Sequence, residues 1–169
     1  MSDTRARVKS HVESNPGVHF NAISRELDIA TGQTQYHIRK LLRENRLTSM
    51  ELCGRTHYFP LGYSEHEQAG FALLRRETTR ELVVLLLDEG PMAPDDLATE
   101  ADIARSTVEW HLSNLVDCEL AEKQYEGRSV RVHVTEPELL RELLVEIDPT
   151  LPDRLVDRFS RLVDSLLEP

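Results

Sequence analysis

The chain contains an internal repeat, and this repeat limits its possible folds more than any other feature of the sequence. The segment Glu26–Leu41 (ELDIATGQTQYHIRKL) recurs as Glu100–Leu115 (EADIARSTVEWHLSNL). A Gly-Arg pair follows each copy at a nearly equal distance, as Gly54-Arg55 and Gly127-Arg128. Two copies of one pattern predict two related small domains rather than one large core.

The first copy carries the signals of three short helices followed by a β-hairpin. Apolar residues recur at helical spacing, the Asn15-Pro16-Gly17 turn ends the first helix, and Thr31 is placed as the N-cap of the third. Two strand-like runs flank Gly54, which supplies the turn. The expected bounds are Arg5–Ser14, Asn21–Leu27 and Thr31 to Arg43 or Glu44 for the helices, and Leu47–Leu52 and Thr56–Phe59 for the strands.

The second copy shows the same order of signals. Residues 64–89 have a helical pattern throughout, which can link the two copies and also provide the first helix of the second. The features expected after it are a helix from Pro94, a helix from Arg105 or Ser106, a hairpin over Tyr125–Val134, a helix begun by the capping-box spacing of Thr135 to Glu138, and a last helix with an apolar stripe from Leu155 to Leu167.

Helix, turn, helix, strand, glycine turn and strand is the order of a winged helix-turn-helix domain. The expected fold is therefore mainly α with small β-hairpin wings: two tandem winged helix-turn-helix domains plus C-terminal helices. The expected division is residues 1–63 for the first domain, 64–135 for a linker helix and the second domain, and 136–169 for C-terminal helices. The regular apolar stripe of the last helix predicts pairing with a second copy, and so a homodimer. Folding back over its own domain is the alternative.

The charge is distributed unevenly along the chain. The net charge is −10, yet residues 1–63 carry nine Lys or Arg and six Asp or Glu, a net charge of +3. Residues 64–169 carry a net charge of −13. The basic character expected of a nucleic-acid binder thus lies in the first copy. No apolar run is long enough for a membrane span and the N-terminus lacks a signal-peptide core, so we expect a soluble, cytoplasmic protein without membrane contact.

The third helix of the first copy is the predicted DNA reader. If its apolar stripe, which includes Thr34, faces inward, a row of polar and basic side chains faces outward. No Asp or Glu occurs between Ile29 and Arg43 in this otherwise acidic chain. Arg55 at the wing tip is expected over a minor groove or a phosphate. The predicted DNA-binding set is Gln33, Thr34, Gln35, Tyr36, Arg39, Lys40, Arg43 and Arg55.

The second copy is predicted to read DNA poorly, because Glu109 and Asp117 stand among its outward positions and would repel phosphates. A scaffolding, dimerisation or regulatory role fits it better, although Arg105, Arg128 and Arg131 could give a secondary DNA contact. A protein-interaction adaptor associated with the transcription machinery is the alternative function for the whole chain. The acidic second half favours it.

The remaining chemistry-bearing residues indicate no enzyme. The chain has no phosphate-binding glycine loop, activated nucleophile or carboxylate pair, and Cys53 and Cys118 have no metal-type spacing. The aligned His37 and His111 are best explained by shared packing inside the helix-turn-helix. We expect no cofactor and no metal. A redox or metal effector acting through Cys53 or the histidines is a minor alternative, and any small-molecule or protein effector stays open.

The run Asn15–Pro60 resembles the winged helix-turn-helix domains of archaeal transcription regulators related to the ArsR and MarR families, through Asn-Pro-Gly, His-Phe, the Tyr-His of the third helix and the Gly-Arg wing. The second copy is similar through Ser106-Thr107-Val108, Trp110-His111-Leu112 and Gly127-Arg128. The resemblance implies the fold and sequence-specific binding of double-stranded DNA. Only three of the twenty basic residues are Lys, a balance that resembles proteins of salt-loving archaea. The sequence departs from the family pattern where Gly usually precedes the wing, at Asn45-Arg46-Leu47 and Cys118-Glu119-Leu120.

Overall fold

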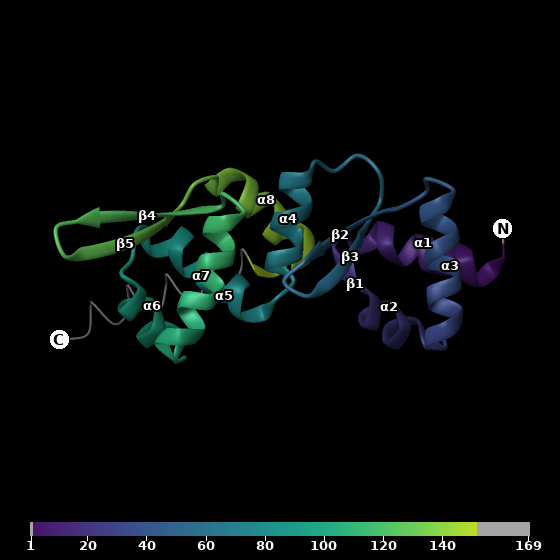
Figure 1. Ribbon diagram of the computed structural model, residues 1–169, viewed down its shortest axis with the longest axis horizontal. Coiled ribbons are helices and arrows are strands. Elements are labelled where there is room, and N and C mark those ends of the chain that lie inside the picture. Colours follow the sequence, from purple (N-terminus) through teal and green to yellow (C-terminus); the bar gives the residue numbers. More distant parts are fainter. Residues whose placement is uncertain (1, 152–169) are drawn as a thin grey trace. The chain divides into compact units, whose positions relative to one another are not determined.

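The computed structural model describes residues 2–151, and within them the chain forms two compact units that divide between Arg76 and Glu77 (Figure 1). Unit 1 runs to Arg76 and unit 2 begins at Glu77. The helix expected after Pro152, with its apolar stripe, lies outside the described residues. No helix in the described part of the chain is both long and apolar enough to span a membrane.

Unit 1 is a helix-turn-helix closed by a small sheet. Its elements are α1 (Asp3–Ser14), β1 (Val18–His19), α2 (Phe20–Leu27), α3 (Thr31–Arg43), β2 (Thr48–Leu52), β3 (Arg55–Phe59) and α4 (Glu65–Leu74). The antiparallel sheet has the order β1-β3-β2. Buried Val8 and Val12 of α1 form one core with Ile23, Ile38 and Leu41 of the next two helices, as the helical periodicity predicts.

The wing of unit 1 is a hairpin with a two-residue loop. Leu52 pairs with Arg55, and Cys53 and Gly54 between them have φ angles of 51° and 74°. Two successive positive φ angles are typical of the type I′ turn that matches the twist of a hairpin. The prediction of a glycine turn is confirmed, but Cys53 shares the left-handed conformation, which its side chain gave no reason to expect.

Two local expectations for unit 1 are wrong. Helix α3 has Ala30 rather than Thr31 at its N-cap, with no side-chain cap, because the chain turns back into the helix directly after buried Ile29. The helical pattern of residues 64–89 is broken into two helices, α4 and α5. At the break, Arg75 donates to the carbonyl of Pro16 at 3.0 and 2.8 Å, and Arg76 donates to that of Cys53 at 2.8 Å. These bonds hold the C-terminal end of α4 in unit 1.

Unit 2 repeats the order of unit 1 with α5 (Glu77–Glu89), α6 (Pro94–Ala101), α7 (Arg105–Asp117), β4 (Ala121–Glu126), β5 (Ser129–Val134) and α8 (Pro137–Ile147). Helices α5, α6 and α7 follow their counterparts α1, α2 and α3 by the same offset as the repeat in the sequence. The short β1–β3 pairing also has a counterpart in unit 2. Met92 and Val132 form a β-bridge, and they occupy the positions in the repeat that correspond to the paired Val18 and Tyr58. Figure 1 shows the β4–β5 hairpin projecting from the helices of unit 2 as its wing.

Two expectations for unit 2 are also corrected. Strand β4 begins at Ala121, ahead of the predicted start of the hairpin at Tyr125, because Leu120 and Ala121 are buried against the helices. Helix α8 has Glu136 at its N-cap and lacks the predicted capping box. The Thr135 hydroxyl instead donates to the carbonyl of Glu119 at 2.6 Å. The overall prediction of a mainly helical fold with two winged helix-turn-helix domains and small hairpin wings is confirmed.

Candidate nucleic-acid interface

Helix α3 separates its buried and exposed residues as its periodicity predicts. Thr34, His37, Ile38 and Leu41 are buried, while Gln33, Gln35, Tyr36, Arg39 and Arg43 are exposed and Lys40 is half-buried. Tyr36 leaves 58% of its surface in solvent, which is a large fraction for an aromatic side chain. The outward row of the predicted reading helix is therefore present as expected.

Thr34 is the exception in the predicted DNA-binding set. Its side chain is fully buried, and its hydroxyl donates to the carbonyl of Ala30 at 3.2 Å within the helix. A side chain with no exposed surface cannot reach a base edge, so the assignment of Thr34 to the DNA-binding set is wrong. The expectation that it faces inward is correct.

The wing and α3 enclose an open groove of about 490 Å³, which we call the α3–wing groove. Gln35 and Arg39 of α3 line it together with Arg55 of the wing, so the fold brings these three predicted residues to one face. His19, Asn21 and Ser49, from β1, the start of α2 and β2, line the same groove. A second recess of about 320 Å³ adjoins it along α3, because Gln35 and Arg39 line both; its other lining residues are Gly32, Tyr36, Lys40 and Arg43.

The basic side chains around these two recesses are not neutralised by carboxylates. Within residues 2–151, no Asp or Glu lies at ion-pair distance from Arg39, Lys40, Arg43 or Arg55. Four other basic residues of unit 1 do have a carboxylate neighbour: Arg5, Lys9, His11 and Arg25. Arg5, for example, lies 3.6 Å from Glu44. Burial, and next the charge of Arg55, holds the pKa of His19 below its ordinary value. The α3–wing groove is therefore a positive surface that favours an anionic ligand.

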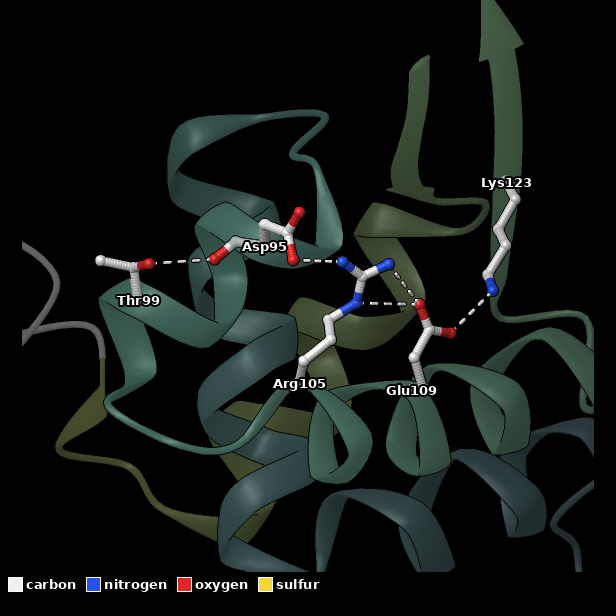
Figure 2. A network of polar contacts seen from close by, with 5 residues as sticks. All are labelled: Asp95, Thr99, Arg105, Glu109 and Lys123. Carbon is white, nitrogen blue, oxygen red and sulfur yellow. Dashed lines mark hydrogen bonds and ion pairs between the residues drawn. The ribbon is translucent and has the colours of Figure 1, made fainter. Parts of the chain in front are cut away.

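The counterpart face of unit 2 is chemically different. Figure 2 shows Asp95 of α6, Arg105 and Glu109 of α7 and Lys123 of β4 converging in one network. Arg105 is paired with Asp95 and also donates to Oε1 of Glu109 at 2.9 and 3.2 Å, while Lys123 donates to Oε2 of Glu109 at 2.9 Å. The hydrogen bond from Lys123 is the main cause that lowers the pKa of Glu109, so this carboxylate stays ionised.

The positions of the buried histidines indicate a role in packing rather than in ligand binding. His37 and His111 are both buried at equivalent positions, and His111 Nδ1 is hydrogen-bonded to the hydroxyl of Thr79 at 2.7 Å. Buried His57 donates from Nδ1 to the carbonyl of Gly17 at 2.7 Å. Cys53 and Cys118 are half-buried. Among the described residues, no group of three or more His, Cys, Asp or Glu side chains is placed to hold a metal ion.

Sequence reasoning missed His19, Asn21 and Ser49 as residues of the groove. They lie on elements other than α3, so helical periodicity gives no signal for them. A signal was available in the repeat itself, because the second copy has the charged residues Asp95 and Lys123 at the counterparts of Asn21 and Ser49.

Comparison with known proteins agrees with this geometry. Residues 2–71 match a family model described as an N-terminal HTH domain, and residues 77–123 match the model of the bacterial regulatory protein, arsR family. The two matches fall on the two units and identify each as a helix-turn-helix domain. The chain is also similar to an uncharacterized HTH-type transcriptional regulator of Methanocaldococcus jannaschii, with 23% identity over 136 residues, which are 80% of this chain. It spans about a third of that relative's length, 34%.

Among solved structures, the chain is similar to reduced HlyU from Vibrio cholerae, with 19% identity, a TM-score of 0.43, and 49% of this chain and 88% of that one covered. An ArsR-like transcriptional regulator from Rhodococcus sp. RHA1 is 26% identical, with a TM-score of 0.38 and coverages of 60% and 89%. The homodimeric winged helix-turn-helix DNA-binding domain of Mb0332 from Mycobacterium bovis is 17% identical, with a TM-score of 0.44 and coverages of 58% and 94%.

Proposed function

We propose that this protein is a sequence-specific, DNA-binding transcription regulator that acts as a homodimer and places α3 of unit 1 in the major groove. The observation that carries the proposal is a set of cations with no carboxylate partner around the α3–wing groove and the recess beside it: Arg39, Lys40, Arg43 and Arg55. Such cations supply the phosphate attraction on which protein–DNA affinity depends. The ArsR-family match and the helix-turn-helix relative support the regulatory role.

Specificity requires groups that read base edges in addition to cations. Gln33 and Gln35 are exposed on α3, and a Gln side chain can pair with adenine N6 and N7. Arg39 lies two turns into the helix and lines both recesses, where its guanidinium can pair with guanine O6 and N7. Lys40 and Arg43, farther along, suit phosphates. We assign Arg55 at the wing to an adjacent phosphate or minor groove.

Dimerisation and location are further parts of the proposal. Apolar residues recur at helical spacing from Leu155 to Leu167 in the sequence, and this pattern supports the homodimer, because a helix with such a stripe would need a second apolar surface. Sedimentation at several protein concentrations tests this part, and a monomer throughout contradicts it. A cytoplasmic location follows from DNA as the ligand. The low Lys content supports a salt-loving archaeal source, so binding should be measured over a wide range of salt.

The decisive experiment is selection from random duplex DNA, followed by affinity measurements on the enriched site. The Arg39→Ala, Lys40→Ala variant should lose the enriched two-fold-symmetric motif. Arg39→Ala alone should weaken specific binding by about 1–3 kcal/mol if it reads a base. The slope of log affinity against log salt should fall by about 0.9 for each phosphate contact removed.

A matched control removes two cations from the wing of unit 2 instead. The Arg128→Ala, Arg131→Ala variant has the same change in charge, and both residues are exposed. We expect its affinity to stay within about twofold of the unaltered protein, because rim charges away from the interface contribute little. Equal losses in the two double variants would contradict the assignment of DNA reading to unit 1.

The adaptor function is kept as a second candidate because unit 2 is strongly acidic and its helix face is closed by ion pairs. It predicts no enriched DNA at any salt concentration. It also predicts that charge reversal at Arg39 and Lys40 leaves the binding of a protein partner intact.

A further inference from the structure

At four positions of the repeat, unit 2 has charged residues where unit 1 has uncharged ones. In unit 2 they hold the network of Asp95, Arg105, Glu109 and Lys123, whose members lie on α6, α7 and β4. The residues at the equivalent positions of unit 1 are all uncharged and polar. They are Asn21, Thr31, Gln35 and Ser49.

The exchange alters the space between the helices and the wing. In unit 1, Asn21, Gln35 and Ser49 line the α3–wing groove, and all three side chains are exposed. In unit 2, Arg105 pairs with Asp95 and with Glu109, and Lys123 pairs with Glu109, so side chains tie α6, α7 and the wing together (Figure 2). The neutral side chains of unit 1 line an open groove, whereas the charged side chains of unit 2 form ion pairs with one another.

We propose that these four positions decide which unit accepts nucleic acid, and that in unit 1 Asn21 and Ser49 bind backbone phosphates of the DNA beside α3. This inference rests on the proposed function and extends it to two further contact residues. The Asn amide and the Ser hydroxyl both donate hydrogen bonds, and such side chains are common phosphate ligands. Arg39 and Arg55 line the same groove and supply the positive charge.

The network excludes a phosphate from unit 2 for two reasons. Arg105 and Lys123 already have carboxylate partners, so a phosphate would have to displace Asp95 or Glu109. Asp95 also leaves 80% of its side chain exposed, which presents a negative charge to any approaching backbone. The same positions in unit 1 carry no charge to oppose a phosphate.

The test transplants the network into unit 1 by Asn21→Asp, Thr31→Arg, Gln35→Glu and Ser49→Lys. The quadruple variant adds two acids and two bases, so the net charge of the protein does not change. Unit 2 shows that the same fold accommodates this set. We expect unchanged far-UV circular dichroism and a more than tenfold loss of affinity for the selected site. Full affinity in a folded variant would overturn the inference.

A milder variant separates the phosphate contact from base reading by Gln35. Asn21→Ala with Ser49→Ala should weaken binding by about five- to tenfold, as expected for two lost hydrogen bonds. Phosphate ethylation provides the direct readout: ethylation of a phosphate that Asn21 or Ser49 contacts should block the unaltered protein and leave this variant unaffected. An identical interference pattern would refute the contact. The unaltered protein binding no duplex at all would instead refute the proposed function on which the inference depends.

Discussion

Replacement of Gly17 by Ala should destabilise unit 1 more than any other glycine-to-alanine change in the wing or its supporting turn. Gly17 has a φ angle of +81°, and a Cβ atom added there would lie 3.0 Å from Cβ of Phe71 and 3.3 Å from Cε1 of Phe59. Phe59 and Phe71 are completely buried. The backbone is held in place as well, because Gly17 donates to the carbonyl of Tyr58 at 2.9 Å.

The magnitude follows from three contributions. The left-handed conformation costs an alanine about 1–2 kcal/mol, and forcing a methyl group into a packed core costs about 1–3 kcal/mol more. Alanine also restricts the unfolded chain, which offsets about 0.4–1 kcal/mol. The free energy of unfolding of unit 1 should therefore fall by about 2–4 kcal/mol.

Gly54→Ala is the matched control, because Gly54 has a similar φ of +74° but no atom within 4 Å of the added Cβ. Only the conformational penalty remains, so this variant should lose about 0.5–1 kcal/mol. Urea unfolding followed by far-UV circular dichroism measures both changes. Trp110, the single Trp of the chain, lies in unit 2, so its emission follows that unit separately. Equal losses in the two variants would refute the packing argument.

Three further predictions concern other strained or buried groups. Glu119 has a φ of 59°, so Glu119→Gly should raise the free energy of unfolding by about 0.5–1 kcal/mol, measured by thermal unfolding; a loss would contradict strain at this position. Burial holds the pKa of His57 below its ordinary value. As the pH falls below about 6.5, this histidine therefore takes up a proton more readily in the unfolded chain than in the folded one, and the free energy of unfolding should decrease. Urea unfolding at pH 7.5 and 5.5 should show this decrease in the free energy of unfolding, and the decrease should be smaller in the His57→Gln variant. Thr79→Val removes the hydroxyl that is hydrogen-bonded to His111 and should lower the free energy of unfolding of unit 2 by about 1–3 kcal/mol. The emission of Trp110, whose ring lies against that of His111, reports this unfolding. An unchanged free energy of unfolding in Thr79→Val would show that this hydrogen bond does not stabilise the fold.

The elements of the fold could be predicted because their signals are local. The helical spacing around Ile38 and Leu41 fixes which face of α3 is buried, and Gly54 marks the turn of the wing. The break between α4 and α5 could not be predicted in the same way. Residues 64–89 keep a helical pattern throughout, and the helix ends where Arg75 and Arg76 bind carbonyls that are distant in the sequence. A tertiary contact of this kind does not alter the hydrophobic periodicity of the sequence, so the pattern does not reveal it.

The site was predictable where it lies on one helix and unpredictable where it is assembled from several elements. Periodicity correctly gave Gln35 and Arg39 as outward residues of α3. The same reasoning placed Thr34 inward, and the structure agrees with that placement rather than with its inclusion among the DNA contacts. Asn21 and Ser49 become part of the site only when the start of α2 and strand β2 meet beside α3.

The two units also act as controls for each other, because they share one packing arrangement. Buried Thr34, Ile38 and Leu41 of α3 are matched by Val108, Leu112 and Leu115 of α7, which are equally buried. The core therefore imposes similar demands on both helices. Arg39 and Arg43, on the exposed face, are matched by Ser113 and Asp117. The shared core therefore does not account for this difference between the two exposed faces. A positive open groove in unit 1 and an acidic, internally paired face in unit 2 are what we expect if, as proposed, DNA is read by unit 1 and unit 2 has another task.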